Sequence, residues 1–257
     1  MHDKFDIRKL DLLKINAIEI LMSITQQTQF GTANASLRTF VLCEDQKAKG
    51  YPFIKRLTSH MLFAFEQGIK VQVFEFFKQL LDNEQTEKKV EFNDLFYKES
   101  LSQFLSFLTS AEDLSPEVSS SLELPVRDAA VDSQAAKIEA YNRSLDYSRF
   151  LVVQLLTKCA QEHAFRFRIF AVQQEVIEKV SRLQRFNSRL LNLWIVKFYK
   201  AIIKAKDEAF VNYLTKKNLL KTISDIFIEN PNKGNLLGSS ILELFDYLSK
   251  EKVNKIG

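Results

Sequence analysis

A pattern of apolar residues that recurs every 43 residues is the feature that most limits how this chain folds. When the second half of the sequence is shifted by this amount against itself, apolar positions coincide. The coinciding pairs include Phe167 and Phe210, Ala171 and Leu214, Val176 and Leu219, Ile177 and Leu220, and Val180 and Ile223. Helical repeats of the HEAT and armadillo types have periods in the low forties. The period therefore predicts an all-α fold, an armadillo/HEAT-like α-solenoid of stacked helical repeats.

The composition agrees with a helical fold. Only 6 glycines and 4 prolines occur in 257 residues, and these residues punctuate strands and turns. Apolar residues follow helical spacing, as in Leu237, Ile241, Leu244 and Leu248. No uncharged apolar stretch approaches the roughly 20 residues that span a bilayer, so we expect no membrane association. Two cysteines are too few for a disulfide framework and favour an intracellular protein.

The chain is expected to form one continuous solenoid with a single interruption. Residues 1–110 are predicted to be N-terminal helical repeats, 111–132 a serine- and proline-containing loop insertion, and 133–257 C-terminal helical repeats. Within the 43-residue register, each repeat has a long helix, a shorter one, and a third after a polar break. The polar pairs Gln173–Gln174 and Lys216–Lys217 mark that break, and Asp207 and Asn218 stand where helix N-caps are useful.

No catalytic, cofactor or metal site is expected. The three histidines are far apart, and neither paired cysteines nor a calcium loop accompanies them. No phosphate-binding glycine loop or nucleophile elbow occurs. Cys159 and His163 lie one helical turn apart, but a buried cysteine beside a partly buried histidine explains them better than a nucleophile and its base. The sequence therefore predicts that the protein is not an enzyme.

The most informative segment for binding is Leu190–Ile203, which is apolar at nearly every position. Such a helix is expected to be sandwiched between neighbours, with Trp194 in the core. The main polar residues near this segment are Lys197, Lys200 and Lys204, which form a stripe along one side of the helix. The stripe is either an ordinary solvated surface or the lining of a groove that receives an acidic partner. In solenoid proteins the repeated inner helices form the concave binding surface, and this favours the groove interpretation.

Further basic residues surround this stripe in the sequence. Arg166 and Arg168 are interleaved with phenylalanines, and they complete our set of candidate partner-binding residues. Residues 158–257 hold 18 Lys and Arg against 10 Asp and Glu, whereas the remainder holds 18 against 22. This asymmetry indicates either a basic binding face or moderately basic solvated helices. Because no recognisable nucleic-acid motif accompanies these residues, nucleic-acid binding is the weaker interpretation.

The C-terminal residues resemble a known family. The resemblance lies in Lys206–Glu208, Tyr213, Lys217–Leu219, Asn230, Asn235–Leu237 and Ser239–Phe245. It continues in Cys159 and His163, with Phe165, Arg168 and Phe170, and more loosely in Asn16–Leu21 and Phe92–Phe104. These segments are similar to the SMEK (falafel) family, regulatory subunit 3 of protein phosphatase 4. Gly238 departs from the family pattern, which has asparagine there, and the serine-rich insertion belongs to this sequence alone.

The resemblance implies an armadillo-like, non-catalytic regulatory scaffold of a protein phosphatase 4-type serine/threonine phosphatase. Its implied partners are the catalytic subunit, the second regulatory subunit and phosphoprotein substrates, and its implied location is the nucleus and cytoplasm. Two alternatives remain open from the residues themselves. One is a helical-repeat kinase scaffold similar to Mo25, and the other is a basic helical module that binds nucleic acid.

Overall fold

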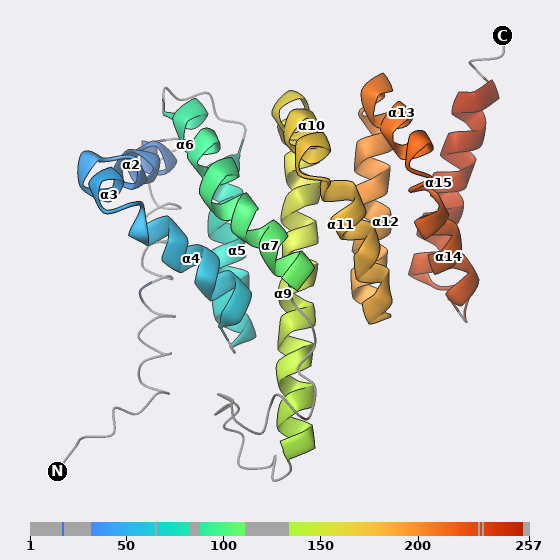
Figure 1. Ribbon diagram of the computed structural model, residues 1–257, viewed down its shortest axis with the longest axis horizontal. Helices are drawn as coiled ribbons and strands as arrows, with labels where there is room; N and C mark the ends of the chain where they lie inside the picture. The colour runs from blue at the N-terminus through green and yellow to red at the C-terminus, as the bar shows by residue number, and fades with distance from the viewer. Residues whose placement is uncertain are drawn as a thin grey trace. The chain divides into compact units, whose positions relative to one another are not determined.

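The computed structural model describes residues 17, 32–64, 66–82, 88–110, 134–230, 232 and 234–253. Within these ranges all regular structure is helical, which confirms the predicted all-α class (Figure 1). The predicted loop at 111–132 and most of the N-terminal helix pattern lie outside the described residues. The chain divides into two compact units between Leu151 and Val152, a point inside helix α9 (Gln134–Glu162).

The first unit contains α2 to α7 and the beginning of α9. Its helices are α2 (Thr32–Val41), α3 (Glu44–Ala48), α4 (Pro52–Phe63), α5 (Gln67–Leu81), α6 (Lys89–Leu95), the π-helix η1 (Phe96–Leu101) and α7 (Ser102–Ser110). α4 packs along α5 and against η1 and α7. Its start is set by Gly50 and Tyr51, whose positive φ angles turn the chain, and by Pro52 in the first helical turn.

Phenylalanine rings form the core of the first unit. The ring of Phe77 on α5 lies 5.4 Å from that of Phe96 and 5.9 Å from that of Phe104, measured between centroids. Phe92 extends the cluster, and all four side chains are buried. Burying each such side chain contributes about 1.5–3 kcal/mol, so this cluster holds α5 against the α6–η1–α7 segment.

The fully buried Lys70 joins α5 to α9 in the same unit. Its Nζ donates hydrogen bonds to the Ser144 carbonyl oxygen at 2.6 Å, to Ser144 Oγ at 2.8 Å and to Ser148 Oγ at 2.6 Å. None of these three acceptors carries a charge. Burial therefore lowers the pKa of Lys70 to about 7, because the ammonium form loses its hydration without gaining a counter-charge.

The second unit repeats one arrangement of helices. It contains the end of α9, then α10 (Ala164–Gln173), α11 (Val176–Ser181), the 3-10 helix η2 (Arg182–Phe186), α12 (Arg189–Lys204), α13 (Glu208–Lys216), α14 (Lys221–Glu229) and α15 (Leu236–Val253). In Figure 1 the short pairs α10–α11 and α13–α14 lie on the near side and α12 lies behind them. α12 packs along α15, the long helix that follows it by one repeat.

The 43-residue register is confirmed by burial within this unit. The paired residues Phe167 and Phe210, Ala171 and Leu214, and Val180 and Ile223 are all buried. The break between the short helices is also repeated, since Glu175 and Asn218 both adopt left-handed backbone angles, with φ of 51° and 52°. The predicted long–short–short order of helices is therefore correct.

Asp207 caps a helix as predicted, whereas Asn218 does not. The Asp207 carboxylate accepts hydrogen bonds from the backbone N–H groups of Ala209 and Phe210 at the start of α13. The prediction of an N-cap at Asn218 is wrong, because this residue ends α13. Its backbone N–H donates to the Thr215 carbonyl and that of Leu219 donates to the Leu214 carbonyl, which is the Schellman pattern.

A buried tyrosine connects consecutive repeats in the second unit. Tyr199 on α12 is fully enclosed, and its hydroxyl donates to the Leu219 carbonyl oxygen at 3.0 Å. The same hydroxyl lies 2.5 Å from Ser181 Oγ at the end of α11. A neighbouring contact joins α13 to α11, where the Tyr213 hydroxyl donates to the Glu178 carboxylate. These polar contacts fix the register between layers that apolar packing alone leaves free to slide.

Candidate functional site

A groove of about 510 Å³ lies between the end of α9 and α12, entirely within the second unit. Its lining residues are Thr157, Ala160, Gln161, Ala164, Trp194, Lys197, Lys200, Ala201, Lys204 and Ala205. Four of them are alanines, whose short side chains leave space between the helices. None of the lining residues is acidic, so the groove has one sign of charge.

The structure brings the predicted lysine stripe together in this groove. Lys197 Nζ lies 4.3 Å from the centroid of the Trp194 ring, a cation–π contact on the same helix. Lys200 forms an ion pair with Glu243 on α15, and Lys204 Nζ lies 5.9 Å from the centroid of the Tyr247 ring. The three lysines therefore line a groove, and the acidic partner expected for it stays a prediction.

The repeat explains why the two sides of α12 differ. Lys200 and Glu243 are 43 residues apart, as are Lys204 and Tyr247, so each lysine meets its equivalent position on α15. On the other side, the equivalent positions on α9 are Thr157 and Gln161. These side chains are neutral. The α9 side of the groove therefore offers the lysines no carboxylate comparable with Glu243.

The lysines lower the pKa of the Glu243 carboxyl group. The hydrogen bond from Lys200, the charge of Lys200 and the charge of Lys204 hold the pKa of the Glu243 carboxyl below its usual value. Glu243 remains well exposed, so this interaction is weakened by salt. The lysine stripe thus stabilises the charged form of the Glu243 carboxylate, although this side chain is exposed to water.

Trp194 belongs to the groove rather than to the core. The prediction that Leu190–Ile203 is enclosed on all sides is wrong, because Trp194 is only partly buried and Leu190 is 44% exposed. The opposite face of α12 does form the core, since Ile195, Phe198, Tyr199 and Ile202 are almost completely buried. On the other face, Trp194 shares the groove lining with alanines and lysines.

The two candidate arginines lie outside the groove lining. Arg168 on α10 donates from Nη1 to the Asp207 carboxylate at 2.7 Å and stacks 5.1 Å from the Phe165 ring centroid. It therefore ties α10 to the start of α13. Arg166 is partly buried on the same helix, and burial lowers the pKa of its guanidinium. The structure thus separates the three lysines from the two arginines.

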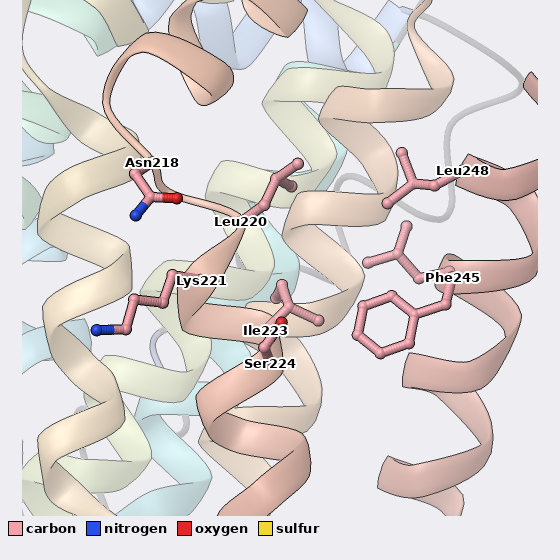
Figure 2. Close-up of a pocket in the computed structure, with 8 residues that line it drawn as sticks. Asn218, Leu220, Lys221, Ile223, Ser224, Phe245 and Leu248 are labelled. Carbon is pink, nitrogen blue, oxygen red and sulfur yellow. The ribbon is translucent and has the colours of Figure 1, made fainter. Parts of the chain in front are cut away.

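A second hollow, of about 380 Å³, lies between α14 and α15. Figure 2 shows Phe245 and Leu248 pointing from α15 toward Leu220 and Ile223, while Lys221 points away from Phe245. The equivalent positions one repeat earlier, Ile177, Val180 and Ile202, are covered by the next layer. This hollow of the last described layer is lined mainly by apolar side chains, with Lys221 at its side.

Cys159 and His163 are enclosed in the fold. Cys159 is 1% exposed and His163 is 9% exposed, as expected for a packing role. Among the residues that the structure describes, no group of three or more His, Cys, Asp or Glu side chains is placed to hold a metal ion. No helix in these same ranges is long and apolar enough to cross a membrane.

Sequence reasoning found the three lysines but missed their surroundings. It did not identify Glu243 and Tyr247 as partners, or the alanines that open the groove. The 43-residue shift places Lys200 on Glu243 and Lys204 on Tyr247, so the signal was present in the register. Only the packing of α9, α12 and α15 shows which equivalent positions face each other.

Comparisons with known proteins identify the family. The family described as Phosphatase 4 regulatory subunit 3 matches residues 5–257. Serine/threonine-protein phosphatase 4 regulatory subunit 3 of Drosophila melanogaster is 27% identical over 194 residues, which is 74% of this chain and 17% of the relative. Suppressor of Mek1 of Dictyostelium discoideum is 24% identical over 216 residues, 79% of this chain and 19% of the relative.

A shorter match agrees with these two. Protein PPP4R3C1 of Mus musculus is 30% identical over 105 residues, 41% of this chain and 13% of the relative. The chain has no significant match among solved structures. It spans less than a fifth of the length of each of these relatives. The family match extends over almost every residue, and this chain belongs to the Phosphatase 4 regulatory subunit 3 family.

Proposed function

We propose that this chain is a non-catalytic scaffold of a protein phosphatase 4-type serine/threonine phosphatase. The observation that carries the proposal is the family match over residues 5–257, whose description is a regulatory subunit. The stacked helices of the second unit support it, because cross-repeat contacts such as Tyr199 to Leu219 hold a surface in a fixed form. A preformed surface loses little conformational entropy when a partner binds.

In this proposal the chemistry belongs to the catalytic subunit. This chain contributes surfaces that hold the catalytic subunit and a second regulatory subunit and that direct phosphoprotein substrates to them. Lys197, Lys200 and Lys204 are the proposed partner contacts, since they line a groove of one charge. Arg166 and Arg168 are proposed as peripheral contacts. We propose the nucleus and cytoplasm as the location.

A binding assay with purified components tests the proposal. The 257-residue chain, carrying an affinity tag, is mixed with purified protein phosphatase 4 catalytic subunit, with and without its second regulatory subunit. We expect a complex at micromolar or lower concentration, and we expect the chain alone to release no phosphate from a phosphopeptide. Failure to bind in both mixtures would overturn the proposed function.

A matched variant shows whether binding uses the folded surface. Tyr199→Ala removes the side chain that joins α11, α12 and the turn before α14. It is expected to unfold the second unit and to abolish the complex, whereas the exposed substitution Lys216→Gln leaves both intact. Equal binding by the Tyr199→Ala protein, with its loss of structure confirmed by circular dichroism, would place the contact outside the second unit.

A further inference from the structure

Between α12 and α15, a lysine of α12 is paired with a glutamate, whereas the lining of the groove between α9 and α12 contains no acidic residue. On the α15 side, Lys200 is paired with Glu243, its equivalent one repeat later. On the α9 side, the equivalent residue is Thr157, whose hydroxyl donates back to the Val153 carbonyl at 2.7 Å. Lys204 and the neutral Gln161, its equivalent on α9, both line the groove. A bound carboxylate on the α9 side would take the place that Glu243 occupies on the other side.

The groove also has an apolar end. Trp194 lines this end of the groove, one helical turn before Lys197 on α12. The lining alanines belong to the Lys204 end, since Ala201 and Ala205 lie beside Lys204 in α12 and Ala160 is equivalent to Ile203 in the 43-residue register. A partly exposed tryptophan beside lysines is the kind of residue that dominates binding energy at interfaces. The ligand therefore needs one apolar group next to several carboxylates.

The dimensions favour an extended ligand. Trp194 and Lys204 are ten residues apart on α12, which at 1.5 Å per residue is about 15 Å. An extended chain that rises about 3.3 Å per residue covers this length in about five residues. A helical segment needs about ten residues for the same length, so an extended segment is the shorter one that reaches from Trp194 to Lys204.

We propose that this groove binds a short, extended, carboxylate-rich segment of a partner protein. An apolar side chain of that segment rests against Trp194. Its carboxylates accept hydrogen bonds from the ammonium groups of Lys197, Lys200 and Lys204. The inference goes beyond the phosphatase role, because it concerns the chemistry of a ligand that binds this chain directly. It is tested without any phosphatase subunit.

The probe is a fluorescent peptide of the sequence Gly-Leu-Glu-Glu-Asp-Glu-Gly, together with its reverse, Gly-Glu-Asp-Glu-Glu-Leu-Gly. Anisotropy is measured with the full 257-residue chain at low salt. We expect one direction to bind, the peptide with Gln and Asn in place of the acids to bind about tenfold more weakly or worse, and a Leu-to-Ser version to lose severalfold. Added salt weakens the binding, because exposed charges are screened. Failure of both acidic peptides to bind overturns the proposal.

Two sets of variants test the location. Lys197→Gln with Lys200→Gln and Lys204→Gln is expected to weaken the acidic peptide about tenfold or more. Its control, Lys216→Gln with Lys221→Gln and Lys250→Gln, removes the same charge from exposed positions outside the groove lining. Equal weakening by both variants would show that only net charge matters and would overturn the groove as the site.

A single isosteric change gives a sharper test. Gln161→Glu introduces a carboxylate on the α9 wall without changing the side-chain shape, at the position equivalent to Lys204. It is expected to compete with the peptide and to reduce its affinity severalfold. Gln173→Glu adds the same charge at an exposed site at the end of α10 and is expected to have little effect. Unchanged affinity in the Gln161→Glu protein contradicts the proposed position of the ligand.

Other polyanions are compared in the same assay. A phosphoserine peptide tests whether phosphate replaces the carboxylates, and a single-stranded oligonucleotide of equal charge tests nucleic-acid binding. The proposal expects both to bind more weakly than the carboxylate peptide. If either binds more tightly and loses affinity in the triple-lysine variant, the groove serves that ligand and the carboxylate proposal is overturned. Thermal unfolding of every variant confirms that the fold is retained.

Discussion

Lys200 on α12 forms an ion pair with Glu243 on α15, the residue at the equivalent position of the next helical repeat. The contact shows that the 43-residue period extends beyond the apolar core to the surface of the long helices. The same period places neutral Thr157 on the other side of Lys200, where the groove opens. The contact between α12 and α15 therefore contains an ion pair, whereas the equivalent space between α9 and α12 is a candidate binding site.

The Lys200–Glu243 pair predicts a measurable change in acidity. Removing the charge with Lys200→Gln takes away the hydrogen bond and the larger part of the positive potential that lower the pKa of Glu243. The pKa of Glu243 is therefore expected to rise toward its usual value, as followed by NMR of the side-chain carboxyl carbon. Lys216→Gln is the control and leaves this pKa in place. An unaltered Glu243 pKa in the Lys200→Gln protein would contradict the pairing.

The buried Lys70 predicts that stability depends on pH. Its pKa is about 7 in the folded protein against an ordinary value of 10.5, so between these values the unfolded chain binds more protons. The free energy of unfolding therefore rises with pH across this window, by at most about 1.4 kcal/mol per pH unit from this group. Below pH 7 the cost of burying the charged amine is complete.

The measurement for Lys70 is urea unfolding at several pH values, compared with the Lys70→Met protein. Methionine fills similar space without a titrating group, so the contribution from Lys70 is absent from its profile. Other titrating groups are common to both proteins and cancel in the difference. Parallel stability profiles for the two proteins between pH 7 and 10 would show that Lys70 stays charged when folded.

Two aromatic residues on α12 predict different costs of truncation. Phe198 is fully buried and contacts the Phe167 ring at 6.1 Å between centroids, so Phe198→Ala is expected to cost about 3–5 kcal/mol. Trp194 lines the groove and is partly exposed, so Trp194→Ala is expected to cost less than Phe198→Ala. Chemical denaturation of both variants measures the difference. An equal or greater loss for Trp194→Ala would place this side chain in the core.

The repeated left-handed turn predicts a stabilising substitution. Glu175 has a φ of 51°, a conformation that costs a non-glycine residue about 1–2 kcal/mol, and it occupies the place that Asn218 holds one repeat later. Glu175→Gly relieves this strain and is expected to raise the free energy of unfolding by up to about 1 kcal/mol. Gln173→Gly, two residues earlier at the last position of α10, is the control and is expected to lower it. Destabilisation by Glu175→Gly would contradict the left-handed turn.

The repeat unit also shows where similar sequence produced different local structure. Phe92, Phe96 and Leu105 follow the spacing of Phe210, Leu214 and Ile223, and all six are buried. In the second unit this spacing contains the break at Asn218, whereas in the first unit the chain continues through the π-helix Phe96–Leu101. Ser100, which stands at the place of Asn218, is buried and hydrogen-bonded to Thr58 at 3.0 Å. Apolar spacing alone does not distinguish these two backbones.

The sequence by itself determined the helical class, the order of helices in the second unit and the lysine stripe on α12. These properties depend on spacing within one helix or on a repeat that is visible along the chain, so local periodicity is enough. The tertiary structure decided that Trp194 lies at a groove, that Arg168 serves Asp207, and that Lys200 meets Glu243 on one side and a neutral wall on the other. These properties depend on the sizes and charges of side chains that face each other across separate helices. Packing brings such residues together, and no local pattern records which of them meet.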